Sequence, residues 1–446
     1  MSFLPDILLT IAIVAAALFI LVFFHELGHF LAAKACRMRV DKFSIGFPPR
    51  ILGFKRGETE YSIGATPFGG YVKIAGMVDE SMDTDFAGSE PQPWEYRSKP
   101  VWQRMVVITA GVVFNMILAA LIYIGMALAY GETMIPTDRM PGLHIAEDSF
   151  AHEVGFRDGD RIVGVNGKRP ENFADLFSPA ELTASSLTYQ VERDGQMADV
   201  PVPPRFLDRL GQEGLVDVSN AIPSLIGFVQ PGSPAESAGL RPGDQVDSVN
   251  GMAVTHWLQV NSLIAQADSS VLLAIQRQGE PVTVATYKDP ETGMVGINYP
   301  PVSEVLDVMQ VRYSLFGAVK AGVSDTGENF TGILQGLAQL VTGRLSLREN
   351  LGGPVAIASI TREATDTLGL QGFWSITAFL SITLAIMNML PIPVLDGGHF
   401  VFLLYEGVTR RELSMRVRIA LQQIGMALLL GLFIFITFND ILKALG

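Results

Sequence analysis

The sequence predicts a membrane α-helical fold with four transmembrane helices, a β-hairpin-like loop and two inserted mixed α/β domains. Three observations predict it: four long apolar segments, a glycine-rich stretch with alternating residues, and an internal repeat. The mean hydropathy of +0.33 and the 17% of charged residues are typical of a membrane protein rather than of a soluble chain. The net charge of -13 argues against nucleic-acid binding, which needs a basic surface.

The first apolar segment, Ile7 to Phe24, is interrupted only by Thr10 and is followed at once by the motif His25-Glu26-Leu27-Gly28-His29. Together they are long enough to span a bilayer as a helix. Histidines four positions apart share a helix face and can bind one metal ion, and the adjacent glutamate can act on water. Ionisable groups at membrane depth are costly, so the motif predicts a zinc peptidase site. The plainer alternative is polar helix-end residues that meet lipid headgroups.

Three further apolar segments, 106–129, 373–395 and 424–438, complete the expected spans. Residues 31–104 hold 11 Lys/Arg, and the short loop 397–423 holds four arginines, whereas none precedes the first span. The positive-inside rule therefore places these two segments in the cytoplasm and both termini outside. The insertion between spans two and three carries 16 Lys/Arg against 30 Asp/Glu, which fits an acidic exterior domain.

The insertion contains a repeat, in which Ser149–Gly167 aligns with Ser233–Gly251 at a constant offset of 84 residues. Nine of the 19 aligned positions are identical, and each copy predicts a short helix, a Gly-Asp turn, a strand and an Asn-Gly turn. This period indicates two compact domains rather than a solenoid. Both copies resemble PDZ domains. The resemblance implies that a loop and strand of the second copy capture a peptide C-terminus, with structural spacers as the alternative. The residues concerned are Ile226, Gly227, Phe228 and Val229.

The third apolar segment ends in a run from Asn388 to His399 that contains two prolines and the sequence Leu-Asp-Gly-Gly. The prolines must break the helix, and irregular backbone survives at membrane depth only where it lines a protein cavity. Entering from outside, this segment reaches Asp396 at its cytoplasmic end, where the first segment reaches His25 and His29. Three protein ligands at similar depth would leave the open fourth position of a catalytic zinc. His399, one turn beyond Asp396, is the competing ligand.

These motifs, in this order with tandem PDZ-like domains between spans two and three, resemble the site-2 protease family of intramembrane zinc metalloproteases, in its bacterial RseP type. The resemblance covers essentially the whole chain. It implies Zn²⁺ bound by His25, His29 and Asp396, with Glu26 as general base and Asn388 as a contact to the substrate backbone. It also implies single-span membrane substrates of the anti-sigma factor type, already cut once outside, and remnant signal peptides. The implied location is a bacterial inner membrane, with both termini and the gating PDZ-like domains in the periplasm.

The stretch Gly46–Gly76 predicts a β-hairpin-like loop, because it is rich in glycine and alternating residues. It resembles the family's membrane re-entrant β-loop, although the family's G-F-G start is Gly46-Phe47-Pro48 here. An exposed strand edge could add a substrate strand by main-chain pairing. The candidate substrate-binding residues are Gly70, Tyr71, Val72 and Lys73. Apolar residues at helical spacing in 311–345 predict amphipathic helices at the outer membrane face, with a solvated linker as the alternative.

The expected organisation follows from these segments. It comprises a first transmembrane helix (1–36), a cytoplasmic segment with the re-entrant loop (37–104), a second transmembrane helix (105–130), two PDZ-like domains (131–222 and 223–304), amphipathic helices (305–371), a third transmembrane segment (372–396), a cytoplasmic loop (397–423) and a fourth transmembrane helix (424–443). Two other functions remain open. They are a catalytically silent PDZ-bearing membrane scaffold, which the intact motif disfavours, and a metal transporter, which the small number of spans disfavours.

Overall fold

The computed structural model describes residues 3–77, 90–147, 149–182, 186–203, 206, 209, 215–216, 218–289, 293–342 and 352–445. The chain divides into unit 1 (Met1–Gly131 and Arg312–Gly446) and unit 2 (Glu132–Val311). Residues 78–89 of the expected cytoplasmic segment and residues 343–351 of the expected amphipathic region lie outside the described residues.

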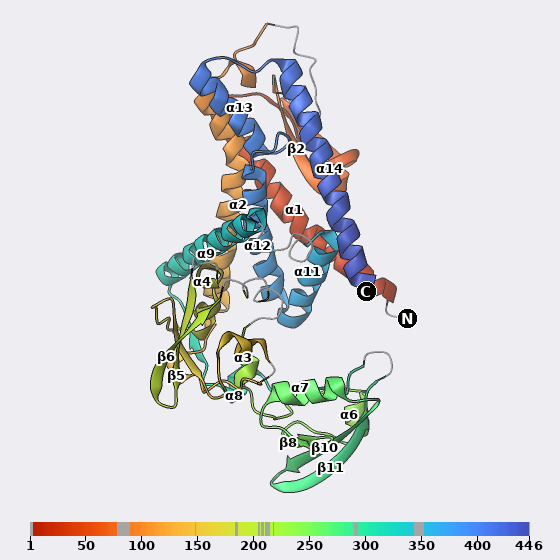
Figure 1. Ribbon diagram of the computed structural model, residues 1–446. Coiled ribbons are helices and arrows are strands. Elements are labelled where there is room, and N and C mark those ends of the chain that lie inside the picture. The colour runs from red at the N-terminus through yellow and green to blue at the C-terminus, as the bar shows by residue number, and fades with distance from the viewer. Residues whose placement is uncertain are drawn as a thin grey trace. The chain divides into compact units, whose positions relative to one another are not determined.

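Among the residues that the structure describes, unit 1 contains four helices that are long and apolar enough to cross a membrane, which confirms a membrane helical protein with four candidate spans (Figure 1). They are α1 (Phe3–Ala35), α2 (Val101–Ala129), α12 (Leu370–Met389) and α14 (Met415–Leu445). Helix α2 packs against both α1 and α12. The first contact is close, because a Cβ on Gly28 would lie 2.4 Å from the carbonyl oxygen of Ala110. Small residues therefore bring the backbones of α1 and α2 together.

Helix α12 ends at Met389, before Pro391 and Pro393, which cannot continue a helix, so the expected segment 372–396 ends in irregular backbone. The chain then forms α13 (Asp396–Thr409), so much of the expected cytoplasmic loop is helical. The irregular segment 390–395, between α12 and α13, lies tightly over the first turn of α13. A Cβ on Gly397 would lie 2.3 Å from the carbonyl oxygens of Leu390 and Met389, so this close approach requires glycine.

A buried ion pair joins α13 to α2. Arg104 and Glu406 are 5% and 7% exposed, and Arg104 Nη1 donates to Glu406 Oε2 over 3.1 Å. Arg418 of α14 lies 3.7 Å from the same carboxylate. Breaking a buried pair by removing one partner costs about 3–5 kcal/mol, since the other charge is left uncompensated. The pair therefore holds the helix that begins with Asp396 against α2.

The glycine-rich stretch forms the paired strands β1 (Val40–Arg56) and β2 (Thr59–Ile74). Residues 42–45 of β1 pair with 70–73 of β2 and also with 60–63, so they lie between these two segments. Segment 70–74 is therefore an edge, because no other strand pairs with it in the part of the chain that the structure describes. Ile51, Leu52 and Phe54, near the turn, are each more than 60% exposed, which gives the hairpin an apolar tip.

Unit 1 also contains the short 3-10 helix η1 (Tyr96–Ser98), α9 (Leu315–Val341), which packs on α2 and α12, and α11 (Pro354–Leu368). Leu315 and Phe316 at the start of α9 are exposed. Asp440 of α14 caps α11, because its Oδ2 accepts hydrogen bonds from the amides of Gly353 (2.9 Å) and Ala356 (3.1 Å). A carboxylate at a helix N-terminus satisfies amides that lack intrahelical partners.

Unit 2 contains two modules with the same order of elements, which the sequence repeat predicts. In the first module α3 (Phe150–Val154) precedes the antiparallel strands β4 (Arg161–Val165), β5 (Leu187–Arg193) and β6 (Gln196–Val202). In the second, α6 (Pro234–Ser237) precedes β8 (Gln245–Val249), β10 (Ser270–Arg277) and β11 (Glu280–Tyr287).

The remaining elements of unit 2 are short. They are β3 (Glu132–Met134), η2 (Thr137–Arg139), η3 (Phe173–Phe177), α4 (Pro179–Leu182), η5 (Val218–Ala221), β7 (Phe228–Val229), β9 (Met252–Ala253), α7 (Trp257–Gln266), β12 (Ile297–Asn298), α8 (Val302–Val305) and β13 (Met309–Val311). Strand β13 pairs with β3, and with this pair unit 2 begins at Glu132 and ends at Val311.

The same hydrogen bonds recur in both modules at the offset of 84. Arg193 Nη2 donates to Asp160 Oδ2, and Arg277 Nη2 donates to Asp244 Oδ2, each over 2.7 Å. Both carboxylates are buried, and their arginines are half-buried. Each pair raises the pKa of its arginine through the hydrogen bond to the carboxylate. The repeat thus extends to a β-strand arginine beyond the aligned motif.

Candidate active site

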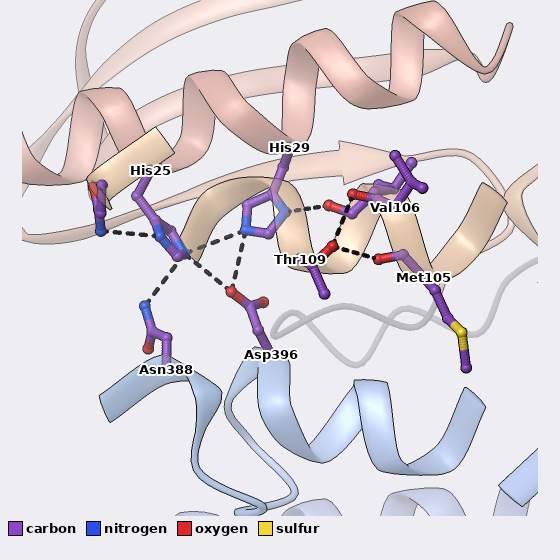
Figure 2. Close-up of polar contacts among 9 residues, drawn as sticks. His25, His29, Met105, Val106, Thr109, Asn388 and Asp396 are labelled. Atoms are coloured by element: carbon purple, nitrogen blue, oxygen red, sulfur yellow. Dashed lines mark hydrogen bonds and ion pairs between the residues drawn. The ribbon is translucent and has the colours of Figure 1, made fainter. Parts of the chain in front are cut away.

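The side chains of His25, His29 and Asp396 converge between α1 and the first turn of α13 (Figure 2). His25 Nε2 lies 3.2 Å from His29 Nε2, and Asp396 Oδ2 lies 3.2 Å and 3.4 Å from these two nitrogens. Within the described ranges, His25, His29 and Asp396 form the one group of three His, Cys, Asp or Glu side chains that could hold a metal ion. His25 and Asp396, which are 371 positions apart in the sequence (396 − 25), are thereby brought together.

The three atoms fit a zinc ion. A tetrahedral Zn²⁺ with bonds of about 2.0–2.2 Å separates its ligand atoms by roughly 3.3–3.6 Å, close to the observed distances. Asp396 Oδ2 is buried and accepts no hydrogen bond in the described structure. His29 Nδ1 donates to the carbonyl oxygen of Val107 over 2.8 Å, so its Nε2 presents a lone pair to the carboxylate. A cation between these acceptors resolves their mutual repulsion.

Helix α2 supports both histidines from behind, which the motifs alone did not predict. A Cβ on Gly111 would lie 2.4 Å from His29 Nε2 and 2.6 Å from His25 Cε1, so only glycine leaves room for both rings. Asn115, fully buried, places Nδ2 3.3 Å from His25 Nδ1. The available signal was a polar side chain in the middle of the second apolar segment, where such residues are costly.

A small cavity of about 70 Å³ adjoins the cluster and contains Glu26. Its lining also includes Tyr71 and Val72 of β2, and a Cβ on Gly70 would lie 2.8 Å from Glu26 Cγ. The full lining is His25, Glu26, His29, Tyr71, Val72, Ile74, Met77, Val107, Ile108, Val394, Asp396 and His399. The edge segment 70–74 therefore reaches the site. Of the four candidates in it, Tyr71 and Val72 line the cavity, whereas Gly70 and Lys73 are not among the lining residues.

Asn388, the last but one residue of α12, points at the cluster, with Nδ2 3.3 Å from His25 Nε2 (Figure 2). His25 Nε2 is the nitrogen that would bind a metal. With a metal bound to it, His25 Nε2 could no longer accept from the Asn388 amide, which would then be available to another oxygen. His399 lines the same cavity, but its Nε2 lies 3.4 Å from Gln422 Nε2, and it is not part of the three-residue cluster.

The candidate peptide-binding stretch lies in unit 2. Ile226 N donates to the carbonyl oxygen of Asp244 and Gly227 N donates to that of Asn298, each over 2.8 Å. These two amides are therefore already used within the module. Phe228 is 54% exposed, and Val229 pairs with Ile297 of β12. A ligand at this strand would have to use Phe228, Val229 or the side-chain surface beside them.

The chain is related over nearly its whole length to known peptidases. Peptidase family M50 is matched by residues 13–432. The chain belongs to this family. It is 31% identical over 463 residues to the regulator of sigma-E protease RseP of Escherichia coli, with 99% of both chains covered. It is 32% identical over 446 residues to the regulator of sigma E protease of Haemophilus influenzae, covering 96% of this chain and 97% of that protein.

Membership of family M50, the site-2 protease family, confirms the resemblance that the motifs indicate and makes the chain a zinc metalloprotease. Relatives from Neisseria meningitidis and Agrobacterium fabrum, each 30% identical, also carry zinc metalloprotease in their names. The three-residue cluster supplies the histidine and carboxylate donors that Zn²⁺ prefers and leaves a position open, as catalytic zinc sites do.

Proposed function

We propose that this M50 peptidase hydrolyses a peptide bond within the transmembrane segment of single-span membrane proteins. The observation that carries the proposal is the position of the cluster. His25 and His29 lie on α1, an apolar helix that could span a membrane, and Asp396 follows the end of α12, another such helix. A soluble substrate needs no site of this kind, whereas a membrane segment can reach it only from within the bilayer.

The proposed roles follow from the geometry. His25, His29 and Asp396 hold Zn²⁺, which when bound supplies Lewis acidity that polarises the scissile carbonyl and activates water. Glu26, buried in the adjoining cavity, accepts the proton of the attacking water and delivers it to the leaving amine. Asn388, released from His25, donates its amide to the substrate backbone. A helical substrate must unwind to present its carbonyl, and the edge segment 70–74 offers main-chain partners for the freed groups.

The finer assignments are also part of this proposal. The names of the Escherichia coli and Haemophilus influenzae relatives connect those proteins to sigma-E regulation, which favours an anti-sigma factor already cut outside as one substrate here. The basic segments 31–104 and 397–423 favour a bacterial inner membrane protein with both termini periplasmic. Unit 2 would then be periplasmic. Its two modules would be PDZ-like domains that control which substrates reach the site.

A direct assay separates this function from the silent scaffold and the transporter. The purified full-length chain, reconstituted in lipid, is expected to contain one zinc and to cut a labelled single-span peptide within its apolar segment. A soluble peptide of the same cleavage sequence serves as the control and is expected to remain intact. Bound zinc without cleavage of the single-span peptide would contradict the proposed function.

The edge segment offers a separate prediction. Val72→Pro removes one backbone N–H from the edge and should slow cleavage at least about fivefold, since one hydrogen bond contributes about 1 kcal/mol. Val72→Ala keeps the N–H and is the matched control. Zinc content should stay at one per chain in both variants. Unchanged turnover of Val72→Pro would show that substrate is not held by strand addition there.

Removing most of unit 2 tests its proposed role in admission. Met134 of β3 pairs with Met309 of β13, so an Asn-Gly linker in place of residues 135–308 should close these strands as a hairpin. This variant should cut an untrimmed single-span substrate that the intact enzyme rejects, since an access filter adds nothing to the transition state. Cleavage of tagged long and pre-trimmed substrates in cells is the measurement.

Two results would refine or contradict that role. Phe228→Ser changes an exposed side chain of the candidate peptide-binding strand, and it should admit the long substrate only if a peptide C-terminus is read there. A deletion variant that contains zinc, cuts the trimmed substrate and still rejects the long one would place the filter elsewhere in the chain.

A further inference from the structure

The hydrogen-bond partners behind the two histidines come from one stripe of α2. Val107, Gly111 and Asn115 are spaced four residues apart, so they lie on the same face of the helix. Val107 supplies a carbonyl oxygen to His29, Gly111 leaves room for both rings, and Asn115 contacts His25. A metal-bound histidine usually donates its second ring N–H to an oxygen, which fixes the orientation of the ring.

His29 meets this requirement. The His25 ring has the backbone of Gly111 within hydrogen-bonding reach, but the Asn115 side chain, as oriented, presents a donor rather than an acceptor to its Nδ1. Asn115 directs Nδ2, a donor, at His25 Nδ1 over 3.3 Å, while its own Oδ1 is buried without a hydrogen-bond partner among the described residues. If Nδ1 of a neutral His25 accepted that hydrogen, Nε2 would carry the ring proton and could not bind a metal. A hydrogen bond from Asn115 Nδ2 to His25 Nδ1 and metal binding through His25 Nε2 therefore exclude each other.

We infer that Asn115 is a positioning residue of the zinc site, whose amide oxygen accepts the Nδ1–H of His25 and thereby directs its Nε2 to the metal. The two ends of an amide are alike in shape, so a half-turn about Cβ–Cγ exchanges them without other movement. The half-turn gives up no other recorded hydrogen bond, because Oδ1 had none. The Asn115 backbone stays fixed, since Ser381 Oγ of α12 donates to its carbonyl oxygen over 2.8 Å.

The inference rests on the zinc ligation proposed above and is tested by two substitutions at one position. Asn115→Asp keeps an oxygen acceptor and removes the donor, whereas Asn115→Leu keeps the shape and removes both. Full-length protein in detergent is stripped of metal and titrated with Zn²⁺ against a chromophoric chelator. Asn115→Asp should stay within about threefold of the unmodified zinc affinity, and Asn115→Leu should lose roughly 10–100-fold. Gly125→Ala on the same helix, where an added Cβ would meet nothing within 4 Å, should match the unmodified chain.

A spectroscopic measurement separates positioning from a general loss of packing. The Co²⁺ form of Asn115→Leu, saturated with metal, should show shifted ligand-field absorption bands because His25 is no longer held in place. Unchanged bands together with unchanged zinc affinity would overturn the inference. An Asn115→Asp variant that loses zinc as severely as Asn115→Leu would also overturn it, since the amide N–H would then be the needed group. An unmodified chain that binds no zinc would instead refute the proposed ligation itself.

Discussion

Replacing Glu26 with glutamine is expected to leave one zinc per chain and to abolish peptide cleavage. Glu26 lies in the cavity beside the cluster, but it is not one of the three converging ligands. Glutamine has nearly the same shape and cannot accept a proton at neutral pH. Loss of a general base lowers the rate of the chemical step roughly 10²–10⁴-fold. Zinc analysis and cleavage of a labelled single-span peptide measure the two effects separately.

Asp396→Asn is the informative comparison for that variant. Asp396 Oδ2 is within 3.4 Å of both histidine nitrogens, and an amide is a poorer zinc ligand than a carboxylate. This variant should therefore lose zinc affinity and turnover together. Loss of zinc from Glu26→Gln, or substantial cleavage by it, would show that the roles of base and ligand are assigned wrongly.

The three residues that converge at the site were predictable from the sequence because each depends on a local pattern. The spacing of His25 and His29 places them on one helix face, and the two prolines before Asp396 end a helix wherever they occur. The repeat in unit 2 was equally visible, since the buried Asp160 and Asp244 recur at a fixed offset. Local rules of this kind need no knowledge of which elements pack together.

The rest of the site depends on long-range packing, which local patterns do not determine. Gly111 and Asn115 matter only because α2 crosses α1 at Gly28 and Ala110, a register that no periodicity in α2 reveals. Ile226 and Gly227 were expected in the loop and strand that capture a peptide C-terminus, and their backbone amides are hydrogen-bonded within the module. Their use by Asp244 and Asn298 follows from pairings across the module. Residues 397–423 were expected to form a loop, whereas Asp396–Thr409 form helix α13. Its apolar side chains pack on partners distant in sequence, which no local pattern reveals.

The close approach at Gly111 gives the second prediction with a large effect. Gly111→Ala should prevent zinc binding, because its Cβ would lie 2.4 Å from His29 Nε2, the atom assigned to the metal, and 2.6 Å from His25 Cε1. Ordinary contacts to a Cβ are about an ångström longer, so either both rings or α2 must move. The loss of zinc affinity should exceed the roughly 10–100-fold that is typical of changes behind a metal ligand.

Gly125→Ala on the same helix is the matched control, because a Cβ there would meet nothing within 4 Å. It alters the composition of α2 in the same way and should bind zinc and cut substrate normally. Zinc titration, cleavage and resistance to limited proteolysis, measured on both purified variants, separate a local effect at the site from loss of the fold. Gly111→Ala with one tightly bound zinc and normal cleavage would mean that α2 does not approach the histidines as closely as the structure shows. The proposed stripe of Val107, Gly111 and Asn115 would then lose its geometric basis.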